Sequence, residues 1–281
     1  MPDYLCPVCQ ELLVVNQANS AYSCARQHHF DRAKAGYLNL LPVQHKHSKD
    51  PGDHPTMLQA RQQFLAAGYY QPLAEAIAQL LDSQIPDGTA SRLLDLGCGE
   101  GYYSRQLASR TGSHRTIEFH GVDIAKFAIA SAAKQHRNGH FVVASTQRLP
   151  YPNAYFDILL RVFAPSNDTE MLRVLKPDGL MLLVTPGPRH LWQLKEFIYA
   201  EVKEHALEAE LPEQCHVVSQ QRCQYRITPT SEHRMTLLQM TPFAWRANLE
   251  AQARIAAAEQ LEIETDFVLT LASCNSYCSI E

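Results

Sequence analysis

The stretch "LLDLGCGEGYY", residues 93–103, decides the fold, because it joins an apolar run to a loop with three glycines. The run "SRLLDLG" predicts a strand, and "YYSRQLAS" after the loop predicts a helix. Open parallel sheets bind their ligands where a strand ends and a helix begins. Glycine has no Cβ, so the backbone of this loop can approach a ligand closely. The stretch therefore predicts an α/β sheet with a ligand site at the loop.

The residues around this loop alternate between expected strands and expected helices. Strands are expected at 91–97, 116–123, 140–145, 155–163, 180–185 and 262–272. Helices are expected at 55–68, 72–84, 102–109, 126–136, 169–175 and 241–261. Such alternation specifies a mostly parallel sheet with helices on both faces. The fold class is therefore α/β, with a Rossmann-like domain.

The glycine spacing separates two classes of cofactor. A nicotinamide fingerprint, G-x-G-x-x-G, would place its third glycine at position 102, where this chain has Tyr102. The spacing here is G-x-G-x-G, led by Asp95, and it resembles motif I of class I S-adenosylmethionine-dependent methyltransferases. Asp123 ends the next expected strand, where a carboxylate can accept hydrogen bonds from both ribose hydroxyls.

Further segments resemble the same fold in the expected order: "FVVASTQRLP", "YFDILLRVFAP" and "VLKPDGLMLLVTP". Many such methyltransferases place an Asp after the third strand to bind the adenine amine, but here Ser145 occupies that region. Adenine contacts from Ser145 or from Gln147 therefore stay open. The resemblance implies that the cofactor contacts Asp95, Gly97, Gly99, Gly101, Tyr102, Tyr103 and Asp123, with Ser145 and Gln147 as the candidates for the adenine.

A second motif lies near the N-terminus, where "CPVC" (6–9) is followed by "CARQH" (24–28). The spacing C-x2-C-x14-C-x3-H suits tetrahedral Zn²⁺, and four protein ligands leave no open position for chemistry. We expect a structural zinc site made by Cys6, Cys9, Cys24 and His28, with His29 as an alternative to His28. Zinc would hold together a module whose own core is too small to fold alone.

The other cysteines have no ligand-like neighbours and are expected to be free thiols: Cys98, Cys215, Cys223, Cys274 and Cys278. The chain has 281 residues, 46% of them hydrophobic and 19% charged, which is typical of a soluble globular protein. It has no apolar run of about 20 residues. The start "MPDYLCPVCQ" lacks the features of a secretory signal. We therefore expect a cytoplasmic protein without a membrane partner.

The net charge of −4 argues against non-specific nucleic-acid binding. Residues 26–49 nevertheless have a net charge of +4. This stretch contains one acidic residue, Asp31, and five basic residues: Arg26, Arg32, Lys34, Lys46 and Lys49. This basic stretch is either a solvated loop or an RNA contact. We expect three parts: a zinc-binding RNA-recognition module (1–40), a connector with helices (41–84) and the class I methyltransferase domain (85–281).

Together the two halves resemble the bacterial 23S rRNA (guanine-N1)-methyltransferases. The resemblance is carried by "CPVC", "CARQHHFDRAKAGYLNLLPVQHKHSKDPGD", "MLQARQQFLAAGYYQPL", "LDLGCGEGYY", "TPGPRHL" and "LLQMTPFAWRA". It implies S-adenosylmethionine and Zn²⁺ as cofactors and a guanine N1 in a 23S rRNA hairpin as the target, with the type acting at guanine 745 favoured over the type acting at 748. It also implies that the zinc module recognises RNA. The tail beyond Phe267 does not follow the family and receives no role.

Candidates for the target pocket lie at the fourth strand: Arg161, Phe163, Ala164 and Pro165. No residue stands out as a general base, so the catalytic residues stay unassigned. One rival reading is a small-molecule methyltransferase acting on a quinone-like precursor, which leaves the zinc module unexplained. The other is a non-enzymatic RNA-binding protein, against which the intact glycines and Asp123 count. The oligomeric state stays open, with a homodimer as one option.

Overall fold

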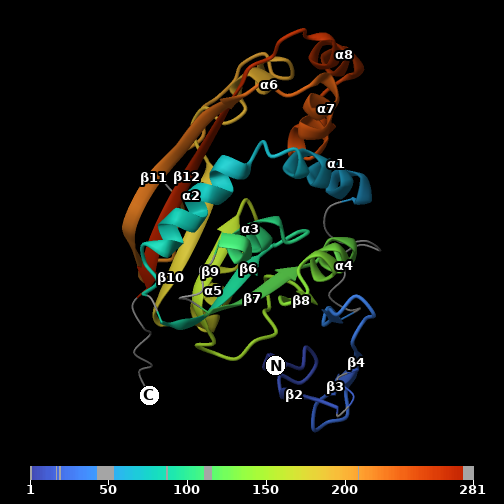
Figure 1. Ribbon diagram of the computed structural model, residues 1–281, viewed down its shortest axis with the longest axis vertical. Helices are drawn as coiled ribbons and strands as arrows, with labels where there is room; N and C mark the ends of the chain where they lie inside the picture. The colour runs from blue at the N-terminus through green and yellow to red at the C-terminus, as the bar shows by residue number, and fades with distance from the viewer. Residues whose placement is uncertain are drawn as a thin grey trace.

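The computed structural model describes residues 2–16, 18, 20–42, 54–86, 88–110, 116–207 and 209–274. Figure 1 shows a large twisted sheet with helices packed against it and a small N-terminal module at one end. The strands are β1 (Tyr4–Leu5), β2 (Leu12–Val15), β3 (Ala21–Ser23), β4 (His29–Asp31), β5 (Leu38–Asn39), β6 (Ala90–Leu96), β7 (Thr116–Asp123), β8 (His140–Val143), β9 (Phe156–Val162), β10 (Leu175–Pro186), β11 (Cys215–Ile227) and β12 (Ile263–Cys274). The helices are α1 (Pro55–Ala66), α2 (Gln71–Asp82), α3 (Tyr102–Arg110), α4 (Lys126–Gln135), α5 (Asp168–Val174), α6 (Trp192–Glu196), α7 (Ser231–Gln239), the 3-10 helix η2 (Pro242–Trp245) and α8 (Leu249–Ala257).

The large sheet has eight strands in the order β11-β12-β10-β9-β6-β7-β8-β5. The pairs from β10 to β5 are parallel, and β12 runs antiparallel to both β10 and β11. The carboxyl ends of the parallel strands therefore meet at one edge, which is where ligands bind in such sheets. The predicted α/β fold with a Rossmann-like domain is confirmed.

The central strands are apolar on both faces because helices cover both. Leu93, Leu94 and Leu96 of β6 have no exposed surface. On one face, Leu73 and Ile77 of α2 belong to the same buried cluster as Leu93. A run of this kind is typical of parallel strands, which alternate less than half-buried strands do.

The N-terminal module is tied into the large sheet. Its four strands form the antiparallel sheet β1-β2-β3-β4, and β5 then pairs in parallel with β8, with Leu38 opposite Val142. Tyr4 packs against Tyr151 with ring centroids 5.5 Å apart, and both side chains belong to one buried cluster that also holds Phe156. The module and the domain built on the large sheet therefore share a buried core.

The C-terminal third differs most from expectation. The expected helix 241–261 is interrupted, because Asn248 adopts an extended backbone and its side chain caps α8 at the amide of Ala251. Strand β11 and helix α7 were not predicted. The tail beyond Phe267, which received no role, continues β12 between β10 and β11 as far as Cys274, with nearly every side chain buried.

Two of the cysteines expected to be free thiols are joined instead. The register of β11 on β12 places Cys215 opposite Cys274, and the two form a disulfide across 59 residues of sequence. Cys98 and Cys223 are free, as expected. Cys278 lies outside the described residues, as do Lys46 and Lys49 of the basic stretch.

Candidate cofactor and target site

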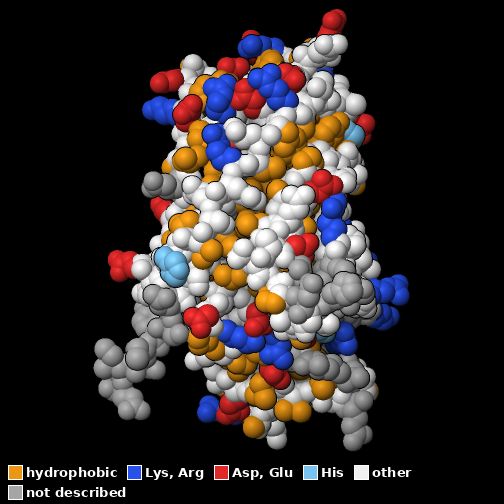
Figure 2. Space-filling view, turned by 60° about the vertical axis from the view of Figure 1, so that its left-hand side comes forward, with side chains coloured by type: hydrophobic (Ala, Val, Ile, Leu, Met, Phe, Trp, Pro, Cys, Tyr) orange, Lys and Arg blue, Asp and Glu red, His pale blue; other side chains and the backbone are white. Residues whose placement is uncertain are grey.

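A pocket of about 1020 Å³ opens at the carboxyl ends of the parallel strands. Its lining comes from the zinc module, the glycine loop, the ends of β7, β8 and β9, helix α1 and the segments before α6 and at η2. Figure 2 shows hydrophobic side chains spread over the middle of the molecule, with Lys, Arg, Asp and Glu gathered at the upper end and again in the lower half. In Figure 1 that upper end holds α6 and α8. The pocket is thus a cleft shared by the module and the catalytic domain.

The glycine loop has a left-handed backbone that favours glycine, with φ of 66° at Gly97, 55° at Gly99 and 73° at Gly101. A Cβ on Gly97 would collide with the Cβ of Ala164, so this glycine lets the loop pack against the end of β9. A Cβ on Gly99 would meet nothing within 4 Å. Gly97 therefore serves packing, whereas Gly99 borders the open space of the pocket. Gly101 is not part of the lining, and a Cβ there would come within 3.2 Å of Ala132 on α4.

Asp123 is held at the end of β7 by two backbone amides. Gly99 N donates to Oδ2 at 2.9 Å, and Ala125 N donates to Oδ1 at 2.8 Å. Each carboxylate oxygen has a second lone pair with which it can accept from a ligand. This arrangement fits a pair of vicinal ribose hydroxyls.

Asp95 is a buried carboxylate, with 2% of its surface exposed, and it lines the pocket. Ser104 Oγ donates to its Oδ2 at 2.7 Å. Burial, assisted by the nearby charge of Asp123, raises the pKa of Asp95 to about 7. A carboxyl group in this state gains from a cation in the pocket. The ammonium and sulfonium of S-adenosylmethionine are cations, so the carboxyl groups of Asp95 and Asp123 fit that cofactor.

The remaining residues predicted to bind the cofactor lie around the same space. Tyr102, Tyr103, Ser145 and Gln147 all line the pocket. Ser145 Oγ accepts a hydrogen bond from Gln147 N at 3.2 Å, which fixes the turn after β8. The adenine contact from these two side chains stays a proposal.

An aromatic platform lines the pocket at the end of β9. Phe163 follows β9 with φ of 55°, which a non-glycine residue rarely adopts, and its side chain is 43% exposed. Its ring stacks on the buried ring of His190 with centroids 5.9 Å apart and an interplanar angle of 26°. Ala164 and Pro165 line the pocket beside it. Arg161 does not line the pocket, and its Nη1 donates instead to Ser166 Oγ at 2.7 Å.

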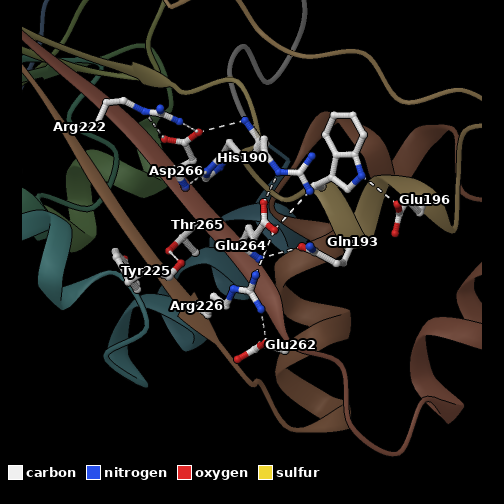
Figure 3. Close-up of polar contacts among 12 residues, drawn as sticks. His190, Gln193, Glu196, Arg222, Tyr225, Arg226, Glu262, Glu264, Thr265 and Asp266 are labelled. Carbon is white, nitrogen blue, oxygen red and sulfur yellow. Dashed lines mark hydrogen bonds and ion pairs between the residues drawn. The ribbon is translucent and has the colours of Figure 1, made fainter.

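Several lining residues were not singled out from sequence: His190, Leu191, His205, Thr241, Pro242 and Phe243. The segments "TPGPRHL" and "LLQMTPFAWRA" contain five of them, so the family resemblance already held the signal. Figure 3 shows how β12 fixes this wall of the pocket. His190 Nδ1 accepts from Asp266 N at 3.3 Å, and Arg222 Nη2 contacts the Asp266 carboxylate at 2.7 Å. Arg189 Nε lies 2.7 Å from Oε2 of Glu264, which also belongs to β12.

The zinc module brings its four expected ligands together. The ligand atoms of Cys6, Cys9, Cys24 and His28 lie within 4.8 Å of one another. Cys9 Sγ and Cys24 Sγ are 3.6 Å apart, and His28 Nδ1 lies 3.3 Å from Cys24 Sγ. Tetrahedral zinc with bonds of roughly 2.0–2.3 Å requires ligand separations of this size. His28 rather than His29 joins the cluster, since His29 lies on β4 with an exposed side chain.

Comparison with known proteins identifies both halves. Residues 4–49 match the family model described as "RlmA, N-terminal", and residues 87–241 match the model described as "Methyltransferase domain". A putative 23S rRNA (guanine-N(1)-)-methyltransferase of Micromonospora griseorubida is 33% identical over 92% of this chain and 93% of its own. The chain belongs to the 23S rRNA (guanine-N(1)-)-methyltransferase family.

Other members of this family also match over most of their length. YxjB of Bacillus subtilis, named a putative 23S rRNA (guanine-N(1)-)-methyltransferase, is 28% identical over 94% of both chains. A 23S rRNA (guanine(748)-N(1))-methyltransferase of Streptomyces fradiae is 30% identical over 89% of this chain and 88% of its own. The protein is therefore an S-adenosylmethionine-dependent methyltransferase with a zinc ribbon. Among the described residues, no helix is both long and apolar enough to span a bilayer.

Proposed function

We propose that this protein methylates N1 of a guanine in a hairpin of 23S rRNA. The observation that carries the proposal is the shared lining of the pocket. Pro7 and Gln10 of the zinc module border the same space as Gly99 and Phe163 of the catalytic domain. An RNA held by the module would therefore present a base directly to the methyl-transfer site. The names of the matched relatives support the same substrate class.

The cofactor half of the pocket is assigned to the glycine loop and the two aspartates. Asp123 would accept from the ribose hydroxyls, and Asp95 would face the cationic end of the ligand. S-adenosylmethionine, when bound, supplies a methyl group on a positively charged sulfur. The work of the protein is then to orient the acceptor in line with that methyl and to exclude water.

The target half is assigned to the platform at the end of β9. A base in a hairpin must leave its stack to reach a buried methyl donor. The exposed ring of Phe163, backed by His190, offers a flat surface on which the turned-out base can stack. Such base–aromatic stacking contributes about 1–3 kcal/mol. Arg161 receives no role in base contact, since it is absent from the pocket lining.

The zinc module is assigned to RNA recognition, with Arg26, Arg32 and Lys34 as described basic residues. Arg32 Nε donates to Gly36 O at 3.0 Å, which holds its guanidinium at the turn before β5. Phosphate contacts fix the register of a protein on its RNA, while base contacts confer specificity. Overall likeness of sequence favours guanine 745 as the target, although one matched relative is named for guanine 748.

A methyl-transfer assay with labelled cofactor tests this function. The acceptors are a 23S rRNA hairpin fragment containing both guanines, the same fragment with inosine at each guanine in turn, and a quinone-like phenol. We expect label in 1-methylguanosine of the fragment and none in the phenol. Neutralising Arg26, Arg32 and Lys34 together should weaken RNA binding and flatten its salt dependence, because fewer counterions are released. Label in the phenol alone would favour the small-molecule rival, and RNA binding without transfer would favour the non-enzymatic one.

A further inference from the structure

A buried pair of titratable side chains borders the target side of the pocket. Lys195, in α6, has 4% of its surface exposed, and its Nζ lies 2.7 Å from Nε2 of His205. His205 lines the pocket, and its backbone amide donates to Pro188 O at 3.2 Å. The ring of Phe243, another lining residue, covers Lys195 Nζ at 5.5 Å. The pair therefore joins the protein interior to the open pocket.

Among the residues that the structure describes, Lys195 has no carboxylate partner of the kind that a buried ammonium ordinarily has. In the described part of the chain, no Asp or Glu oxygen lies within ion-pair distance of its Nζ. Because a buried, unpaired ammonium is costly, burial lowers the pKa of Lys195 to about 8. Burial and the neighbouring lysine lower the pKa of His205 as well. Near neutral pH the pair is thus close to losing one proton.

The other titratable groups near the pair, His190 and Asp266, are already engaged in hydrogen bonds, so the pair is the available proton acceptor. His190 faces it from the segment before α6, and burial lowers the pKa of His190 to about 3, so that its ring is neutral. His190 Nδ1 accepts from Asp266 N and is occupied. The Asp266 carboxylate of β12 is bound by Arg222 at 2.7 Å (Figure 3). It also accepts from the amide of Arg189 at 3.0 Å.

We propose that His205 and Lys195 form a proton relay that removes the N1 proton of the target guanine, an inference that rests on the function proposed above. With Lys195 neutral, His205 Nε2–H donates to Nζ and the Nδ1 lone pair is free. Nδ1 accepts the N1 proton while the Nε2 proton passes to Nζ. The electron pair of the N1–H bond stays on the guanine. N1 forms its bond to the methyl group as the sulfur–methyl bond breaks, and the sulfur keeps that electron pair.

The relay accounts for a buried lysine whose described polar contact is with a histidine and not with a carboxylate. In the relay, His205 is the catalytic residue because it would take the proton from the base, and Lys195 is a positioning and proton-storing residue that acts through it. The relay requires neutral Lys195, so the methyl-transfer rate should rise with pH up to about 8 and then level off. The tautomer of His205 should switch over the same range, from Nδ1–H at lower pH to Nε2–H at higher pH.

Single-turnover methyl transfer to the 23S rRNA hairpin, measured from pH 6 to pH 9.5 with the full chain, tests the relay. His205→Gln should lower the plateau rate by about 100-fold, the usual range for a general base. Lys195→Met should lower the rate by about tenfold and remove the inflection near pH 8. The exposed residues in His216→Gln and Lys203→Met are the matched controls and should leave the rate unchanged. Cofactor affinity should be unchanged in all four variants, which verifies that each is folded.

A second measurement does not depend on activity. Nitrogen-15 NMR of the imidazole rings should show the His205 tautomer switch near pH 8 in the wild type and no switch in Lys195→Met. Rates within threefold of wild type in both His205→Gln and Lys195→Met would overturn the relay while leaving the proposed function intact. Failure of the wild type to methylate guanine N1 at any pH would overturn the proposed function and the relay with it.

Discussion

The amide of Gly99 donates a hydrogen bond to the carboxylate of Asp123 across 2.9 Å, which joins the glycine loop after β6 to the end of β7. A second amide, that of Ala125, holds the other carboxylate oxygen at 2.8 Å. The carboxylate that we propose as the ribose acceptor is therefore fixed in place by the backbone of two neighbouring loops. Binding does not have to order this side chain, which lowers the entropic cost of capturing the cofactor.

Removal of this acceptor should weaken cofactor binding. Asp123→Ala leaves the ribose hydroxyls without a partner and frees the Gly99 amide, so we expect a loss of about 1–3 kcal/mol. Isothermal titration calorimetry measures the affinity for S-adenosylmethionine. Asp31→Ala, at an exposed aspartate of the zinc module, is the control. Equal affinities for the Asp123→Ala variant and the wild type would contradict the assignment.

The two glycines at 97 and 99 should respond differently to the same substitution. Gly97→Ala brings a Cβ onto Ala164 and should lower the unfolding midpoint more than Gly99→Ala does. Gly99→Ala places its Cβ in the open pocket and should mainly reduce cofactor affinity. Both variants carry the strain of a left-handed alanine, which costs about 1 kcal/mol and cancels in the comparison. Thermal unfolding and calorimetry on both variants check this; the reverse ranking would be inconsistent with the geometry.

The ionised carboxylate of Asp95 should lower the free energy of unfolding of the ligand-free protein and should strengthen cofactor binding. Its pKa in the folded protein is raised to about 7, so its contribution to stability is present below its ordinary pKa near 4 and is lost as pH rises through 7. Asp95→Asn stays neutral and should stabilise the ligand-free protein above pH 7 by about 1–3 kcal/mol, with little gain at pH 4. The same change should weaken cofactor binding. Denaturant unfolding at the two pH values measures the first effect, and a gain independent of pH would argue against a buried ionisable carboxylate.

Loss of zinc should destabilise the whole chain and not the module alone. Cys9→Ser removes one of the four ligands, and the module shares the buried cluster of Tyr4, Tyr151 and Phe156 with the catalytic domain. We expect the metal content to fall from one zinc per chain to none and the midpoint of the main transition to fall by roughly 5–10 °C. Calorimetry and element analysis measure both quantities. Cys223→Ser, in β11, is the matched control. A catalytic domain that unfolds at the wild-type temperature without zinc would show that the two cores are uncoupled.

Short-range patterns carried most of what the sequence could predict. The three glycines of the loop lie within five residues of sequence, and the zinc ligands come in two closely spaced pairs. The spacing within each motif therefore limits its geometry directly. Arg161 was expected to line the pocket, but its side chain contacts Ser166 instead. The pattern of a strand does not show which neighbour a long side chain at its end will contact. The Cys215–Cys274 disulfide, the pairing of β5 with β8 and the contact of Lys195 with His205 depend on register and packing between distant segments. These features emerge only once the sheet has assembled.

The most direct test of the central claim is the modification state of 23S rRNA in cells that lack the gene. Primer extension stops at 1-methylguanosine, because the methyl group blocks base pairing at N1. We expect the stop at guanine 745 to vanish in the deletion strain, to return with the wild-type gene and to stay absent with the Asp123→Ala gene. An unchanged pattern of stops across 23S rRNA in the deletion strain would contradict the account.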